Sequence, residues 1–143
     1  TNSIPLCELH IAGSSDNGFF KSQTKGQIYF DGFVNDIQTY ALEKGVLVSP
    51  IVSGSGVRIK ILEMMAIGIP IITTTLGASG INYTDSNCLI IANKDTEIID
   101  AILELTKNKE SRKKIGQNAI AYIRKNHNIE YISNEIIEFI KGT

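Results

Sequence analysis

Short apolar runs and amphipathic stretches alternate along the chain. Runs rich in isoleucine and valine, bounded by glycine, serine or proline, predict buried strands, and longer periodic segments predict helices. The predicted strands cover residues 6–12, 27–30, 46–49, 70–74 and 88–92. The predicted helices cover 37–43, the run between Gly56 and Gly68, 98–105, 110–125 and 129–140, with a brief turn at 20–22.

This alternation predicts an α/β fold with a parallel sheet covered by helices on both faces. Ligands of such sheets bind at the carboxyl ends of the strands, near a change in strand order. Three loops follow predicted strand ends: 32–34, 54–56 and 76–80. We therefore expect these three loops to share one rim of the sheet.

The most informative stretch reads strand, glycine-rich loop, helix, strand over residues 46–74. Arg58 and Lys60 fall in the predicted first helical turn, where the helix dipole disfavours cations by roughly 0.3–1 kcal/mol. Free N–H groups also point outward there, so a bound anion would stabilise the arrangement, and phosphate is the usual one. Glu63 shares the helix face of Lys60. It either accepts hydrogen bonds from a ligand's hydroxyls or pairs with Lys60 on an ordinary core helix.

Composition narrows the function classes. The 143 residues fit one domain, 1–143, and the formal net charge of −1 favours neither nucleic acid nor a membrane surface as partner. No apolar run approaches the length of a membrane span, and no signal peptide is expected from the polar start. Cys7 and Cys88 fall in predicted strands without metal-like spacing, so both are expected to be buried and reduced.

Other motifs give little support to rival chemistries. A dinucleotide fingerprint would need glycine where the chain has Ile59, and a P-loop pattern is missing. His10 and His127 have no metal-ligand companions in sequence, so structural roles are predicted for both. No nucleophile-elbow set of serine, histidine and aspartate is visible. The sequence therefore predicts neither a metal site nor a cofactor.

Several motifs together carry a family resemblance. The run 54–70, G-S-G-V-R-I-K-I-L-E-M-M-A-I-G-I-P, resembles the donor-binding motif E-G-F-G-x-x-x-x-E-A-M-A-x-G-x-P-V-[IV]. That motif is typical of GT-B glycosyltransferases of the GT4-like "glycosyl transferases group 1" family. Residues 9–13, 28–36 and 46–50 resemble the family's L-x-I-V-G, V-x-F-x-G-x-V-x-D and V-x-P-S segments. Residues 111–119 resemble its L-R-x-x-x-G-x-x-A helix.

The resemblance implies a C-terminal, Rossmann-like domain that binds a nucleotide-sugar donor as substrate. Carried over by position, Glu63 matches the glutamate that hydrogen-bonds the nucleotide ribose, and Gly54, Ser55 and Gly56 match the loop over the diphosphate. Arg58 and Lys60 match positions where some members place cations against phosphate. The resemblance also implies a rim around the donor site. Gly32, Phe33 and Val34 would border the base, and Gly77, Ala78, Ser79 and Gly80 would approach the sugar.

Two departures from the family pattern matter. Ser55 stands where the family has its first glutamate, which leaves the sugar and the stereochemistry open. The family's first strand and its acceptor-binding domain have no counterpart before residue 6, so the chain resembles a fragment. Strands 6–12 and 46–49 would then pair directly, or another chain, such as a dimer partner, would complete the sheet.

The resulting hypothesis is the donor half of a glycosyltransferase. Its glycan or lipid-linked acceptor would bind the missing domain, and the catalytic residues stay unknown. We expect it to act in polysaccharide biosynthesis in the cytoplasm, free or at the periphery of the inner membrane. Two alternatives stay open: a non-catalytic binding or scaffold domain of the same fold, and a GT-B nucleotide-sugar epimerase.

Overall fold

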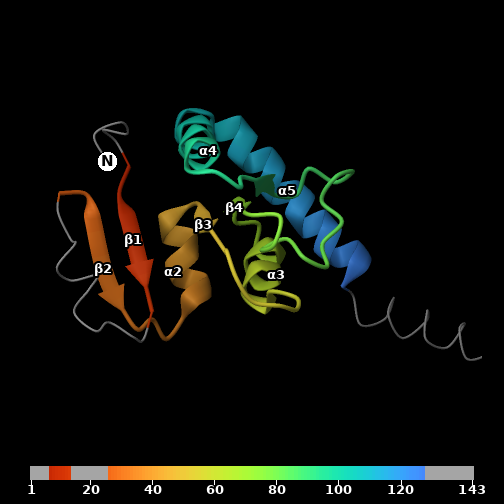
Figure 1. The fold of residues 1–143 in the computed structure, drawn as a ribbon, viewed down its shortest axis with the longest axis horizontal. Coiled ribbons are helices and arrows are strands. Elements are labelled where there is room, and N and C mark those ends of the chain that lie inside the picture. The colour runs from red at the N-terminus through yellow and green to blue at the C-terminus, as the bar shows by residue number, and fades with distance from the viewer. Residues whose placement is uncertain (1–6, 14–25, 128–143) are drawn as a thin grey trace, which may run out of the picture. The chain divides into compact units, whose positions relative to one another are not determined.

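A computed structural model describes residues 7–13 and 26–127 of the chain (Figure 1). The predicted turn at 20–22 and the predicted helix at 129–140 lie outside these residues. The chain divides into two compact units, Thr1–Lys44 and Gly45–Thr143. Each unit has its own parallel sheet, so they are considered in turn.

The first unit consists of two parallel strands and a helix. Strand β1 (Leu9–Ala12) pairs with β2 (Ile28–Gly32), and helix α2 (Ile37–Lys44) follows. The register slips by one residue at Asp31, because Ile11 faces Phe30 whereas Ala12 faces Gly32. The carboxylate of Asp36 caps α2 by accepting hydrogen bonds from two backbone N–H groups at 3.1 Å.

The second unit is a three-stranded parallel sheet with three helices (Figure 1). Its elements are β3 (Leu47–Ser49), α3 (Ile59–Ala66), β4 (Ile71–Thr73), β5 (Ile90–Ile91), α4 (Asp95–Lys107) and α5 (Lys109–Asn126). The strand order is β3-β4-β5, which makes β4 central. All three residues of β4 are buried, as expected for a parallel strand covered on both faces.

The core of this unit lies between β4 and α4. Ile72 of β4 packs with Ala101 and Leu105 of α4 and with Ala92, which follows β5. Asn108 then joins α4 to α5: it ends α4, and its side-chain oxygen accepts a hydrogen bond from Ser111 N at 3.0 Å. One residue therefore ends the first helix and caps the second.

Helix α5 crosses the end of α3 at a contact between two glycines. A Cβ atom on Gly116 would lie 2.3 Å from the carbonyl oxygen of Gly68. Gly68 has a φ of +78° and ends the segment that follows α3, so it cannot move without changing the turn into β4. The family-like motifs at 54–70 and 111–119 thus meet in space at their glycines.

Most of the sequence predictions of secondary structure are confirmed, with two corrections. Direct pairing of the first and third strands stays a prediction, because β1 and β3 belong to different units. The helix after Gly56 begins only at Ile59, which places Arg58 at the N-cap with an extended backbone. Cys7 and Cys88 precede their strands instead of lying in them; both are free thiols, Cys7 half-buried and Cys88 buried.

Substitution of Gly116 by alanine tests the glycine contact. Alanine favours a helix over glycine by about 1 kcal/mol. The new Cβ would nevertheless meet a backbone oxygen that cannot rotate away, and overpacking of this kind costs about 1–3 kcal/mol. We therefore expect Gly116→Ala to lower the free energy of unfolding, measured by urea denaturation followed by circular dichroism.

Gly13→Ala is the matched control, because a Cβ there would meet nothing within 4 Å. It should change the free energy of unfolding by no more than the amount typical of surface substitutions, about 0.5 kcal/mol. A Gly116→Ala variant as stable as this control would contradict the close approach of α5 to Gly68.

Candidate functional site

The carboxyl ends of the strands in the second unit are held together by side-chain hydroxyls. Thr73 Oγ1, at the end of β4, donates to Ser49 O at the end of β3 over 2.8 Å. Thr74 Oγ1 donates to Ile51 O and accepts from Gly77 N at 3.0 Å. Both threonines are buried, so these bonds are shielded from water and fix the loops that follow β3 and β4.

The end of β5 joins the same edge. Ala92 N donates to Thr73 O at 2.8 Å, which continues the ladder beyond the strand. The side chain of Asn93 then bonds to Thr75 twice, accepting from its N–H at 2.9 Å and donating to its hydroxyl at 3.1 Å. Three strand ends therefore form one rigid edge.

Two of the three predicted rim loops meet at this edge. A Cβ on Gly80 would lie 2.9 Å from a methyl group of Val57, so the loop 76–80 passes directly beside the segment that leads into α3. Within the loop 76–80, Gly77 and Ala78 are buried, Ser79 is half-buried with its hydroxyl bonded to Leu76 O, and Gly80 is exposed.

The remaining predicted loop consists of Gly32, Phe33 and Val34. It follows β2 and belongs to the other unit, and its Phe33 is 71% exposed.

Helix α3 presents a free N-terminus at this edge. Its N-cap residue, Arg58, makes no side-chain cap, and its first turn contains no acidic residue. The first helical bonds come from Ile61 N and Leu62 N to Arg58 O, so the N–H groups of the preceding residues lack helical acceptors. Such an end binds anions through its N–H groups and its dipole.

Arg58 points back over the glycine loop. Its two terminal nitrogens donate to Ser55 O and Ser53 O, both at 3.4 Å. The Nε atom is buried and has no hydrogen-bond partner. Arg58 was predicted to lie in the first helical turn, but it is the N-cap residue, and its guanidinium donates to carbonyl oxygens of the loop.

Lys60 and Glu63 lie on the exposed side of α3. Ile61, Met64 and Met65 form its buried side, and Lys60 and Glu63 are both exposed. Neither takes part in the ion pairs found within residues 7–13 and 26–127, both of which join His10 to a carboxylate. The paired-lysine alternative therefore finds no support, and an ammonium and a carboxylate remain available beside the free helix end.

The arrangement suits binding more than proton transfer. It offers N–H groups, one free ammonium and one exposed carboxylate at a rigid edge. Among the described residues no group of three or more histidines, cysteines, aspartates or glutamates could hold a metal ion. The site can thus stabilise an anion electrostatically and accept hydrogen bonds from hydroxyl groups.

Sequence reasoning missed a polar network in the first unit. His10 Nδ1 lies 2.7 Å from Asp31 Oδ2, and His10 Nε2 lies 3.3 Å from Glu8 Oε2. Tyr40 OH donates to the same Asp31 oxygen at 2.6 Å, and the His10 ring stacks on Tyr29 with centroids 4.9 Å apart. A histidine and an aspartate on neighbouring strands, both facing one helix, were the available signal. The network supports the structural role predicted for His10.

These contacts shift two pKa values. The hydrogen bond from Tyr40, helped by that with His10 and by its charge, lowers the pKa of Asp31, although burial opposes the shift. Burial and the Asp31 carboxylate raise the pKa of Tyr40. The ionised form of Asp31 is therefore favoured in the folded protein.

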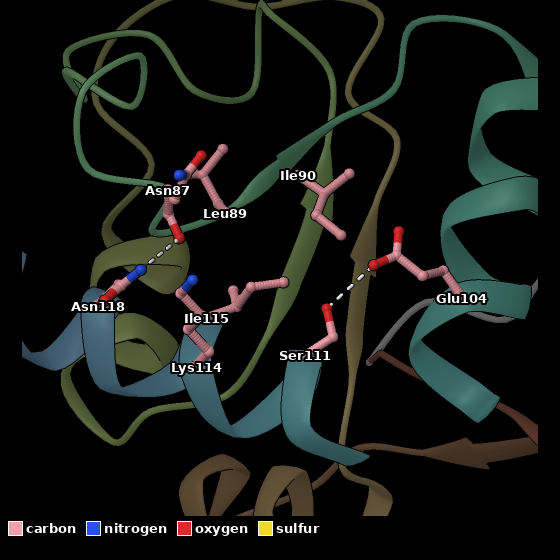
Figure 2. A pocket seen from close by; sticks show the side chains of 8 residues that line it. All are labelled: Asn87, Leu89, Ile90, Glu104, Ser111, Lys114, Ile115 and Asn118. Carbon is pink, nitrogen blue, oxygen red and sulfur yellow. Dashed lines mark hydrogen bonds between the residues drawn. The ribbon is translucent and has the colours of Figure 1, made fainter. Parts of the chain in front are cut away.

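A hollow of about 280 Å³ lies away from the rim, where β5 begins (Figure 2). Its walls are Asn87, Leu89, Ile90, Glu104, Ser111, Lys114, Ile115 and Asn118. Ser111 Oγ donates to Glu104 Oε1 at 3.0 Å, and Asn118 donates to Asn87 O at 3.3 Å, as the dashed lines show. The polar walls thus bond to one another and join α5 to its neighbours, and the hollow contains none of the predicted site residues.

The model of the family described as "Glycosyl transferases group 1" matches residues 2–108. The chain belongs to this family. A curated relative, the "Uncharacterized 44.6 kDa protein in cps region" of Klebsiella pneumoniae, is 26% identical, covering 94% of this chain. The chain spans 37% of that relative's length.

Solved structures show the same fold. The C-terminal domain of a glycosyl transferase group 1 family protein (LpcC) from Francisella tularensis is 24% identical, with a TM-score of 0.62, over 76% of this chain and 58% of that one. WaaG, "a glycosyltransferase involved in lipopolysaccharide biosynthesis", is 20% identical with a TM-score of 0.67, over 83% and 34%. TarM is 18% identical with a TM-score of 0.76, over 96% and 29%.

The predicted fold class is confirmed by these likenesses: an α/β domain with parallel sheets flanked by helices. Family membership and fold agree with the motifs at 54–70 and 111–119. In the described part of this group 1 domain, no helix is long and apolar enough to cross a membrane.

Asp31 gives the domain a specific pH dependence. Because its folded-state pKa lies below the unfolded value of 3.8, its stabilisation is present above that pH and is lost as the pH falls through the folded-state pKa. With 30% of the side chain exposed, we expect Asp31→Asn to cost about 1 kcal/mol at pH 7. Thermal unfolding from pH 7 to pH 2.5, followed by circular dichroism, should show the wild-type advantage shrink below about pH 4.

Asp85→Asn is the control, because Asp85 is exposed and makes no side-chain hydrogen bond among the described residues. Equal stability of the Asp31→Asn and Asp85→Asn variants at pH 7 would show that the carboxylate of Asp31 does not hold the first unit together.

Proposed function

We propose that this group 1 domain binds the nucleoside-diphosphate sugar donor of a glycosyltransferase and releases the diphosphate when the sugar is transferred. The observation that carries the proposal is the free N-terminus of α3 at the carboxyl edge of the sheet, with Lys60 and Glu63 exposed beside it. Open parallel sheets bind their ligands at this edge.

The chemistry of the donor fits the groups available. A diphosphate gains negative charge as the bond to the sugar breaks, and N–H groups with a nearby ammonium stabilise that charge. Glu63, an exposed carboxylate of α3, supplies an acceptor for the ribose hydroxyls of the nucleotide. No general base is assigned among the described residues, so activation of the acceptor is left to groups outside them.

Finer features belong to the same proposal. We place the chain in the GT4-like subfamily, as the C-terminal half of a GT-B enzyme whose other half binds a glycan or lipid-linked acceptor. The Klebsiella relative is named as a protein "in cps region", which supports a role in polysaccharide biosynthesis. A cytoplasmic setting agrees with the free thiols of Cys7 and Cys88.

One observation supports a second candidate, a non-catalytic binding domain. Ser55 is exposed in the loop where the family pattern has a glutamate, and its carbonyl is bonded to Arg58. A serine hydroxyl cannot carry the charge of that glutamate. Transfer or hydrolysis of a nucleotide sugar by the polypeptide that the intact gene encodes would exclude this candidate.

Glu63→Ala tests the site. We expect about tenfold weaker binding of the preferred nucleoside diphosphate among UDP, GDP and ADP, because a charged acceptor of the ribose hydroxyls is lost. Binding of inorganic pyrophosphate, which has no ribose, should not weaken. Isothermal titration calorimetry on the polypeptide of the intact gene measures both affinities.

Asp100→Ala is the control of equal charge, since Asp100 is an exposed acidic residue of α4. It should leave both affinities unchanged. Undiminished nucleotide binding by Glu63→Ala would refute the assignment of Glu63, and failure of the wild-type protein to bind any of the three nucleotides would refute the proposed function.

A further inference from the structure

We infer that Arg58 is a positioning residue: it holds the glycine loop so that two backbone N–H groups face the donor diphosphate, and it does not bind the phosphates itself. The inference rests on the proposed function, which supplies the ligand. It changes the role that the sequence pattern suggested for Arg58, a cation placed against phosphate.

The contacts of Arg58 are with the loop. Its Nη1 and Nη2 atoms each donate to a loop carbonyl, Ser55 O and Ser53 O respectively, at 3.4 Å. The planar guanidinium can bridge two acceptors at fixed spacing, which an ammonium group cannot do. Arg58 therefore determines the direction of the peptide groups 53–54 and 55–56 at the same time.

The direction of those carbonyls decides the direction of the next N–H groups. In a trans peptide the C=O and N–H bonds point in opposite directions, and no peptide bond in the described residues is cis. With both carbonyls facing Arg58, the N–H groups of Gly54 and Gly56 face the other side of the loop. Neither N–H has a hydrogen-bond partner among the described residues. Free N–H groups on one side of a loop can bind an anion between them.

Both glycines of the loop have backbone conformations that favour glycine, and Gly54 also lies against Arg58. Gly54 has a φ of +105° and Gly56 a φ of +86°, values that favour glycine. A Cβ on Gly54 would lie 2.9 Å from Nη2 of Arg58, so the guanidinium occupies the space of a side chain at that position. The position of the Arg58 guanidinium therefore depends on the absence of a side chain at Gly54.

The charge of Arg58 is accounted for by this arrangement. A cation at a helix N-terminus is unfavourable unless its charge is compensated. The two carbonyl oxygens provide compensation to Arg58, whereas Lys60 has no partner within the described residues and remains the cation that can reach the phosphates. The two basic residues of the motif therefore have different roles.

Arg58→Gln and Arg58→Lys separate positioning from direct contact. If Arg58 positions the loop, both variants should bind the nucleoside diphosphate roughly tenfold more weakly, because lysine keeps the charge but lacks the planar pair of nitrogens that holds two carbonyls at a fixed spacing. If Arg58 contacts phosphate, the lysine variant should keep most of the affinity. Titrations use UDP, GDP and ADP, and inorganic pyrophosphate, with the polypeptide of the intact gene.

A readout without ligand tests the same inference directly. Heteronuclear NOE measurements on the backbone amides should show Gly54 and Gly56 to be more mobile in both Arg58 variants than in the wild-type protein. Lys60→Gln is the matched control: it removes a charge two positions away, should weaken diphosphate binding with a shallower dependence on salt, and should leave the loop amides unchanged.

The outcomes are distinguishable. Wild-type affinity in Arg58→Lys, or unchanged mobility of the two glycine amides in Arg58→Gln, would overturn the positioning role. A wild-type protein that binds no nucleotide and no pyrophosphate would refute the proposed function, yet the amide mobilities in the absence of ligand would still decide whether Arg58 holds the loop. Dispersed amide spectra of the variants establish that they are folded.

Discussion

The complete burial of β4 is the constraint on which the second unit depends. A strand buried on both faces must satisfy its backbone through its neighbours, and β4 does so with β3 on one side and β5 on the other. Its last residue, Thr73, is buried as well, so its hydroxyl must also find a partner, and it bonds to Ser49 O. The rigid edge of the sheet follows from this need to satisfy buried polar groups.

A rigid edge allows the loops themselves to carry little regular structure. The loop 53–56 contains two glycines with left-handed φ values, a conformation that a free chain would rarely maintain. It is anchored on one side by the end of β3 and on the other by Arg58 at the start of α3. The N–H groups of Gly54 and Gly56 are thereby held in an exposed loop, as the proposed binding of a diphosphate requires.

The sequence predicted the elements and the parallel pairing because both depend on periodicity and on local signals. Asp36 and Gly45 bound α2 as expected, and Lys60 and Glu63 lie on the exposed side of α3. The direction of the Arg58 side chain could not be predicted, because it depends on whether phosphate or carbonyl oxygen is closer in three dimensions. The contact of His10 with Asp31 likewise depends on strand register.

The choice of strand neighbours also lay beyond the pattern. Residues 6–12 and 46–49 have the same apolar character, and nothing in composition tells which strand each one pairs with. Register and neighbour choice are set by packing between distant segments, as for Ile72 with Ala101 and Leu105. Periodicity predicted the fold class, and the family resemblance pointed to the same one.

The contact of Gly68 with Gly116 affects how the phenotype of a substitution at Gly116 should be interpreted. It lies at the far end of α3 from the glycine loop, and a Cβ on Gly116 would lie 2.3 Å from the carbonyl oxygen of Gly68. A side chain at position 116 would therefore have to be accommodated by a shift of α5 or of the segment that ends α3. Under the proposed function, lost donor use in such a variant would reflect helix packing, although the substituted residue lies a helix length away from the loop 53–56.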